Sequence, residues 1–166
     1  MKGLNEKKEV RVGIADGAVV SSPDKLITLG LGSCVGIAIY DNKKKVAGLA
    51  HIMLPDSTQF KNIVNPFKYA DLGVDAIVKK MISLGCKKEN MTAKIAGGAS
   101  MFNFPDKKII SDVGKRNSKA VIDAIREIAI PLVGEDVGGN KGRTMVFESE
   151  DGSVLIKSIG SNIKEL

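Results

Sequence analysis

The sequence contains one pairing of residue types that could carry out covalent catalysis. Cys34 lies in the stretch ITLGLGSCVGIAIYD, directly after Gly32 and Ser33, and His51 is the only histidine of the chain. A cysteine thiolate attacks acyl carbons, and an imidazole within reach accepts the thiol proton and returns it to the leaving group. Because glycine bends the backbone at low cost, Gly32 and Ser33 could present backbone N–H groups to an oxyanion. Cys34 and His51 are therefore a candidate nucleophile and base for acyl transfer.

The segments around these two residues predict a β-hairpin that would bring them together. CVGIAIYD and KVAGLAHIML read as strands that are joined by the polar turn around NKK. A four-residue loop at 41–44 or 42–45 would place His51 opposite Cys34 or opposite Gly36, in both cases on the same face as Cys34. A five-residue loop would send His51 to the other face. The catalytic interpretation depends on this loop length, which the sequence does not dictate.

Each of the two residues also has a simpler interpretation. A free cysteine is usually a small buried hydrophobic residue, and a lone histidine is often a hydrogen-bonded core residue. The glycines at 30, 32 and 36 miss the G-x-G-x-x-G spacing, and a strand follows them instead of a helix, which argues against a nucleotide-binding loop. On the residues alone, a structural pair and a catalytic pair both stay open.

Composition limits the classes of partner. The 166 residues carry a formal net charge of +6 and only 4% aromatic residues. Since so few aromatics make no base-stacking platform, we expect no nucleic acid, and an acidic protein surface is the partner that scattered lysines would suit. The lack of a long apolar run and of a signal-peptide core predicts a cytoplasmic protein without membrane insertion and with reduced cysteines. Two cysteines and one histidine without zinc spacing predict no metal.

The length of 166 residues indicates a single domain in residues 10–166, preceded by a charged extension at residues 1–9 that we expect to be disordered. Periodicity and turn residues predict both strands and helices in this domain, in an order that is compatible with an α+β fold. One helix is predicted over 66–84, with Asn65 as its N-cap and Gly85 after its end. A second helix with an apolar face is predicted in NSKAVIDAIREIAI. Besides the hairpin, strands are predicted in EVRVGIADGAVV, KLITLGL, TAKIAGGASMF, RTMVFES and SVLIKSIG.

Six stretches resemble, in this order, the CheD family of chemoreceptor glutamine deamidases: TLGLGSCVGIAIYD, GLAHIMLPDS, KYAD, KIAGGASMF, VGKRN and EDVGGNKGR. The resemblance covers the chain from about Val12 to Lys157. It implies a cytoplasmic chemotaxis enzyme that converts selected glutamine side chains of methyl-accepting receptors into glutamates, with no cofactor. It also implies a fold of two stacked mixed β-sheets flanked by helices, similar to the catalytic domain of cytotoxic necrotising factor.

The resemblance further implies roles for particular residues. Cys34 would be the nucleophile, His51 its base, and Thr28, which opens TLGLGSC, would complete the triad by orienting the imidazole. The residue pattern alone gives no reason to choose Thr28, since a threonine in a strand is usually only a strand former. The phosphatase CheC is implied as a regulatory partner. Met101 and Phe102 are candidates for that contact, with a core position as the alternative.

Two functions from different classes are compatible with these observations. The chain is a deamidase that acts through a thioester on Cys34, or it is a non-catalytic docking regulator of receptors or of CheC. The complete set of Thr28, Cys34 and His51 favours the enzyme without excluding docking. The sequence assigns no partner to the second cysteine, Cys86.

Overall fold

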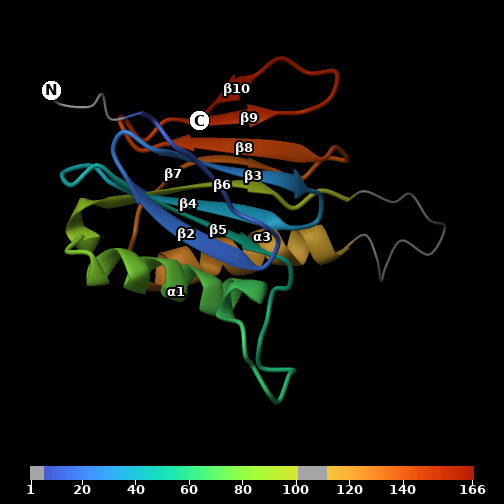
Figure 1. Ribbon diagram of the computed structural model, residues 1–166. Coiled ribbons are helices and arrows are strands. Elements are labelled where there is room, and N and C mark those ends of the chain that lie inside the picture. The colour runs from blue at the N-terminus through green and yellow to red at the C-terminus, as the bar shows by residue number, and fades with distance from the viewer. Residues whose placement is uncertain (1–5, 101–111) are drawn as a thin grey trace, which may run out of the picture.

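The computed structural model describes residues 6–100 and 112–166 as two five-stranded β-sheets with helices on one of them (Figure 1). In the first sheet the strands follow the order β1 (Glu9–Arg11), β3 (Lys25–Leu31), β8 (Arg143–Glu148), β9 (Val154–Lys157) and β10 (Lys164–Glu165). In the second sheet the order is β2 (Asp16–Ser21), β5 (Val46–Ile52), β4 (Val35–Asp41), β6 (Met91–Gly97) and β7 (Leu132–Val137). The helices are α1 (Ala70–Ser83), α3 (Asp112–Glu127) and the short 3₁₀ turns η1 (Pro66–Lys68) and η2 (Lys88–Asn90).

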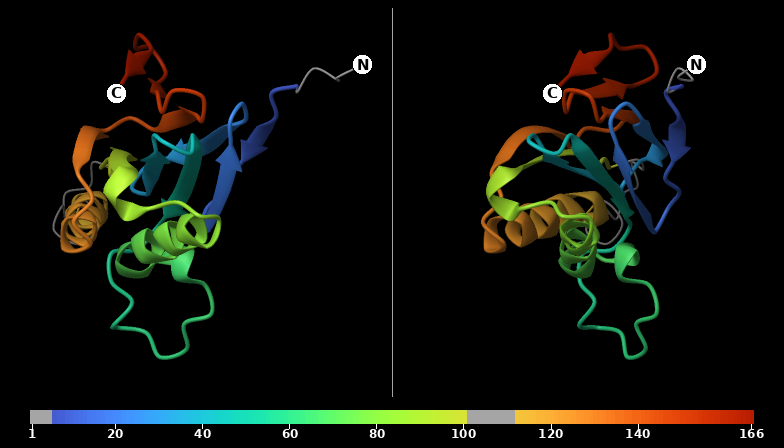
Figure 2. Two further views of the ribbon diagram at one scale, coloured as in Figure 1. Left: turned by 90° about the vertical axis from the view of Figure 1, so that its left-hand side faces the viewer. Right: turned by 60° about the vertical axis from the view of Figure 1, so that its left-hand side comes forward.

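Both sheets are mixed. β1 is parallel to β3 and β6 is parallel to β7, whereas the other neighbouring strands are antiparallel. The predicted α+β class with two stacked mixed sheets is thereby confirmed. Helices α1 and α3 lie against each other and cover the outer face of the second sheet, so that the molecule has three layers (Figure 2).

Two apolar cores separate these layers, and the β4–β5 hairpin borders both of them. All residues of β4 and β5 are buried. Alternate residues of β4, such as Val35 and Ile37, pack toward the helices, while Ala38 and Tyr40 pack toward the first sheet. This alternation follows from the two-residue period of a strand. A residue of the hairpin therefore belongs to one core or the other according to its parity.

The first helix begins later than predicted. Residues 66–68 form the 3₁₀ turn η1, where the side chain of Asn65 accepts a hydrogen bond from a backbone N–H as a cap does, but α1 begins only at Ala70. The backbone of Tyr69 is extended because this residue forms a parallel β-bridge with Leu54. The predicted end is correct within one residue, and Gly85 there has a φ of +94°.

The second helix and the strand after it also differ from the predicted pattern. α3 begins at Asp112, before the predicted start at Asn117, and ends at Glu127. The strand β7 was not predicted from the sequence. Its apolar alternation is interrupted by Glu135 and Asp136, and as an edge strand it buries little of its length.

Some expectations fall outside the described residues. Met101 and Phe102, the candidate contacts for CheC, lie there, and so do residues 1–5 of the expected extension at 1–9. Glu9, the last residue of that extension, already begins β1. Within residues 6–100 and 112–166, no helix is long and apolar enough to cross a membrane.

Candidate active site

The hairpin register places His51 on the face that the candidate nucleophile also uses. The loop between β4 and β5 spans residues 42–45, because Asp41 pairs with Val46, and His51 consequently pairs with Gly36. This is the second of the two registers that the four-residue loop allowed. Cys34, two residues before Gly36, has the same parity and packs against the core between the sheets.

Cys34 lies one residue before β4, and the register of the hairpin makes its position diagonal to that of His51. Diagonal positions on one face of an antiparallel pair lie roughly 7 to 8 Å apart, a gap that a thiol and an imidazole can bridge. The position between them, opposite His51, is Gly36, and a Cβ there would lie 2.7 Å from Sδ of Met145. Glycine therefore allows the first sheet to approach the hairpin closely at the site.

The hydrogen bonds of Thr28 define the tautomer of His51. Oγ1 of Thr28 lies 2.7 Å from Nδ1 of His51 and 2.7 Å from the carbonyl oxygen of Val12. A carbonyl can only accept, so the single hydroxyl proton of Thr28 is donated to Val12. Nδ1 of His51 must then carry a proton and donate it to Thr28. Nε2 is left unprotonated, and it has no hydrogen-bond partner among the described residues.

Burial keeps this imidazole neutral. His51 is 0% exposed, and burial lowers its pKa from the ordinary value of 6.5 to about 4. Burial disfavours the charged form of any base, and no carboxylate contributes to the shift. At neutral pH His51 therefore offers the free electron pair of Nε2, which is what a general base requires.

Cys34 is held as a thiol in the resting protein. Its side chain is half-buried, and burial raises the pKa of the thiol, while the residue's own backbone N–H acts in the opposite direction. A neutral thiol beside a neutral imidazole differs from a preformed thiolate–imidazolium pair. The proton has to move when the sulfur attacks.

The turn before β4 is clamped through its backbone. Gly98 N–H donates to the carbonyl of Cys34 and Ala99 N–H to that of Gly32, each at 2.8 Å. Gly97, with a φ of +118°, approaches so closely that a Cβ would lie 2.1 Å from the carbonyl oxygen of Cys34. Within the turn, the N–H of Gly32 donates to Gly30, at 3.0 Å. Of the two predicted backbone supports, Gly32 thus has its donor engaged.

The other predicted support, Ser33, contacts a residue that the sequence reasoning missed. Asn117 of α3 is fully buried, and its side-chain Nδ2 donates to the carbonyls of Ser33, at 2.9 Å, and Met53, at 3.0 Å. The signal in the sequence is an amide placed four residues before Val121 on the apolar stripe of the helix. The acceptors are backbone carbonyls, which no residue pattern reveals.

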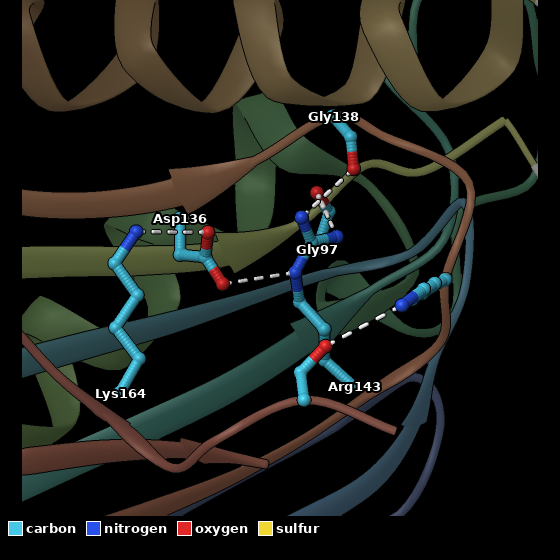
Figure 3. Close-up of polar contacts among 7 residues, drawn as sticks. Gly97, Asp136, Gly138, Arg143 and Lys164 are labelled. Atoms are coloured by element: carbon cyan, nitrogen blue, oxygen red, sulfur yellow. Dashed lines mark hydrogen bonds and ion pairs between the residues drawn. The ribbon is translucent and has the colours of Figure 1, made fainter. Parts of the chain in front are cut away.

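A second polar cluster supports the strand that clamps the turn (Figure 3). Arg143, nearly buried, donates from Nε to Asp136 at 3.1 Å, from Nη1 to the carbonyl of Gly97 at 3.1 Å and from Nη2 to that of Gly138 at 2.8 Å. Lys164 adds a weaker contact to Asp136 at 3.4 Å. These contacts give Asp136 a structural role, because its carboxylate is committed to two cations.

A surface hollow of about 520 Å³ borders Gly30, two residues before Gly32 in the turn that leads to Cys34. It is lined by Gly30, Lys141, Gly142, Arg143, Thr144, Lys157 and Ile159. Arg143 of this lining is already paired with Asp136, so the cationic charge that faces a ligand comes from Lys141 and Lys157. The hollow therefore suits an anionic ligand or an acidic protein surface.

Cys86 belongs to a different environment from Cys34. It is buried in the core between the second sheet and the helices, on the opposite side of the hairpin sheet. Burial and the neighbouring carboxylate of Asp41 raise the pKa of this thiol. A buried thiol with a raised pKa is inert, so only Cys34 has the exposure that a nucleophile needs.

Comparison with known proteins identifies a family for this sequence. Residues 53–158 match the family model described as CheD chemotactic sensory transduction. The chain is 58% identical, over 97% of its length and 99% of the relative's, to a "Probable chemoreceptor glutamine deamidase CheD" of Clostridium botulinum strain Eklund 17B, and 57% identical, over 96% and 98%, to that of strain Hall.

Solved structures with a similar outline are more distant. A Neisseria meningitidis protein of the DUF152 family has a TM-score of 0.49 and 8% identity, with 86% of this chain and 75% of the other covered. The Bacillus licheniformis hypothetical protein YfiH has a TM-score of 0.45 and 16% identity, with 73% and 50% covered. The family assignment rests on the sequence matches. By its identity to curated relatives over nearly its whole length, the chain belongs to the CheD family.

Proposed function

We propose that this protein is a cytoplasmic chemoreceptor glutamine deamidase in which Cys34, His51 and Thr28 form the catalytic set. The observation that carries the proposal is the hydrogen-bond arrangement at His51. Nδ1 is bonded to Thr28, so the unprotonated Nε2 is left on the face that Cys34 shares. The names of the relatives supply the substrate class, a glutamine side chain of a chemoreceptor.

The first half of the reaction forms a thioester. Nε2 of His51 accepts the thiol proton as Sγ of Cys34 attacks the side-chain amide carbon of the glutamine. The carbonyl oxygen becomes an oxyanion. When the tetrahedral intermediate collapses, the imidazolium returns its proton to the amide nitrogen and ammonia leaves. The glutamyl group is then bound to Cys34 through a thioester.

The second half hydrolyses that thioester. His51 accepts a proton from water as the water oxygen attacks the thioester carbon, and the sulfur leaves and takes the proton back. The product is a glutamate side chain and the enzyme returns to its thiol form. Thr28 acts on the imidazole in both halves, because its oxygen accepts the hydrogen bond from Nδ1–H and stabilises the transient positive charge. No step requires a cofactor.

Burial explains why a threonine suffices as the third member. The pKa of His51 lies at about 4, so the imidazole is neutral before the reaction and needs only to be held in the correct tautomer. An anionic carboxylate would raise that pKa and would itself need to be buried, at a cost in desolvation. A neutral hydroxyl that also bonds to Val12 fixes the tautomer without adding charge.

Two partners follow from the proposal. The receptor is the substrate, and the cationic lining of the hollow beside Gly30 supports an acidic segment of it as the bound surface. CheC is proposed as the regulator. Its predicted contacts, Met101 and Phe102, lie outside the described residues, so this part rests on the family resemblance.

Deamidation of a receptor fragment tests the proposal directly. The wild type and Cys34→Ala are incubated with receptor cytoplasmic fragments, and ammonia release is measured with the intact mass of the fragment. We expect ammonia and a mass gain of about one dalton per site from the wild type, because NH₂ is replaced by OH, and neither from Cys34→Ala. A folded wild type that binds receptor or CheC without turnover would replace the deamidase by the docking regulator.

A further inference from the structure

The buried amide of Asn117 links α3 to the backbone on both sides of the catalytic pair. Its Nδ2 contacts the carbonyl of Ser33, directly before the nucleophile, and that of Met53, two residues after His51. Both acceptors are carbonyls, so the NH₂ end of the amide must face them. The orientation of Asn117 is therefore fixed by chemistry.

The contact with Ser33 also orients the next N–H group. The carbonyl of Ser33 and the N–H of Cys34 belong to one planar trans peptide unit, in which the two groups point in opposite directions. A hydrogen bond that holds the Ser33 carbonyl toward α3 consequently holds the Cys34 N–H away from α3. In the described part of the chain, no backbone acceptor takes this N–H, whereas the N–H of Gly32 is engaged.

The Cys34 N–H also lies next to the reacting sulfur. Burial raises the pKa of the thiol, and the N–H of the same residue acts in the opposite direction. A donor next to the sulfur is close to where the oxygen of an attacked carbonyl must lie, because sulfur and oxygen become bonded to the same carbon. Preorganised donors of this kind stabilise the oxyanion of acyl transfer.

We propose that Asn117 is a positioning residue that fixes the Cys34 backbone N–H as the oxyanion donor. The inference rests on the acyl-transfer chemistry proposed for Cys34. Of the two supports expected from the sequence, Gly32 has its N–H engaged and Ser33 contributes the carbonyl that Asn117 holds; the proposal adds the N–H of Cys34 as the oxyanion donor and gives the helix layer a part in catalysis. Asn117 itself touches neither substrate nor sulfur in this role.

A purely structural role for Asn117 makes a different prediction. If its two hydrogen bonds only hold α3 on the sheet, their loss changes every reaction of Cys34 by a similar factor or changes none. If they orient the Cys34 N–H, their loss slows only reactions that pass through an oxyanion. Two reagents separate these cases. Iodoacetamide alkylates sulfur by displacement of iodide, without an oxyanion, whereas p-nitrophenyl acetate acylates it through a tetrahedral oxyanion.

The variant that tests the inference is Asn117→Leu, which keeps the shape of the side chain and removes both donors. Asn117→Ser, which retains one donor, is the milder second variant if Asn117→Leu does not fold. The matched control is Tyr40→Phe, which removes a buried hydrogen bond of 2.9 Å to the carbonyl of Ser149 at the other end of β4. Cys34→Ala gives the background from Cys86.

We expect Asn117→Leu to lower the acylation rate by about tenfold or more while the alkylation rate stays within about twofold of the wild type, since loss of one oxyanion donor costs about 100-fold to 1,000-fold. Tyr40→Phe should leave both rates unchanged, and Asn117→Ser should give an intermediate loss in acylation alone. Equal loss in both reactions, or loss in neither, would overturn the inference.

The same assays separate this inference from the proposed function, because neither reagent requires a receptor. A wild type that fails on receptor fragments while Asn117→Leu loses acylation selectively removes the deamidase and keeps the role of Asn117. Deamidation by the wild type without that selective loss removes the role of Asn117 alone. If Cys34→Ala is acylated as fast as the wild type, both fall.

Discussion

The hydroxyl of Thr28 and the Nδ1 nitrogen of His51 are joined by a hydrogen bond of 2.7 Å that spans the two β-sheets. Thr28 belongs to β3 of the first sheet and His51 to β5 of the second. Because the only hydroxyl proton is donated to Val12, the bond fixes the proton of the imidazole on Nδ1.

Thr28→Val should lower kcat about 10-fold to 100-fold with little change in KM. The variant keeps the volume of the side chain but removes the oxygen that accepts the hydrogen bond from Nδ1–H. The imidazole therefore loses its fixed tautomer during proton transfer. Steady-state ammonia release from a receptor fragment measures both constants. Thr28→Ser, which keeps the hydroxyl, should recover most of the activity, and wild-type kcat in Thr28→Val would contradict the assigned role.

The free energy of unfolding should depend on pH through His51. The unfolded imidazole binds a proton below about 6.5, whereas the folded one binds it only below about 4. Between these values the unfolded state holds more protons, so stability falls as the pH is lowered through this window. Urea unfolding at several pH values measures the slope. His51→Gln, which cannot titrate, should show a smaller slope, and parallel curves for the two proteins would refute the assignment.

Alkylation of Cys34 by iodoacetamide should accelerate steadily as the pH rises through neutral. Burial raises the pKa of the thiol and lowers that of His51, so no thiolate–imidazolium pair forms at acidic pH. The rate is measured by the mass of the alkylated protein, with Cys34→Ala as the background. A plateau of high reactivity between the pKa of His51 and neutral pH would indicate a preformed ion pair and would contradict this prediction.

Gly97→Ala should destabilise the protein and disturb Cys34 together. A Cβ at Gly97 would lie 2.1 Å from the carbonyl oxygen of Cys34, in addition to the strain of a φ of +118°. Gly160→Ala is the matched control, because Gly160 has a φ of +75° but open space around it, and strain alone costs on the order of 1–2 kcal/mol.

Thermal unfolding and the alkylation rate of Cys34 are measured for both glycine variants. We expect the larger loss of stability, and a changed alkylation rate, only in Gly97→Ala. Equal effects of the two variants would show that the close approach of Gly97 to the backbone of Cys34 is unimportant.

The sequence predicted the parts of the site that depend on local geometry. The strand period limited His51 to the face of Cys34 for a four-residue loop and to the other face for a five-residue loop, and the structure has the four-residue loop at 42–45. The end of α1 followed from periodicity and from Gly85, whereas the two stacked sheets of the α+β fold came from the family resemblance, with which the predicted element order was compatible. The role of Thr28 came only from the family resemblance, since its partner lies in a different sheet.

What the sequence did not reveal depends on tertiary contacts. Asn117 acts on backbone carbonyls, which leave no trace in the residue types around them. The start of α1 is delayed by the bridge between Tyr69 and Leu54, two residues whose pairing no local pattern indicates. β7 forms because it pairs in parallel with β6, a strand that is distant in the sequence. Its own residues include Glu135 and Asp136 and show no apolar alternation, so a search for that pattern does not find it.

The bond between Thr28 and His51 has a consequence during synthesis of the chain. The nucleophile and the base reside in one hairpin, but the group that orients the base comes from the opposite layer, and the amide that holds the turn comes from α3, far downstream. A nascent or partly opened chain therefore possesses the thiol without the machinery that directs it. In the proposed mechanism, the complete catalytic set therefore exists only once all three layers have assembled, so activity and the native packing of the layers are gained together.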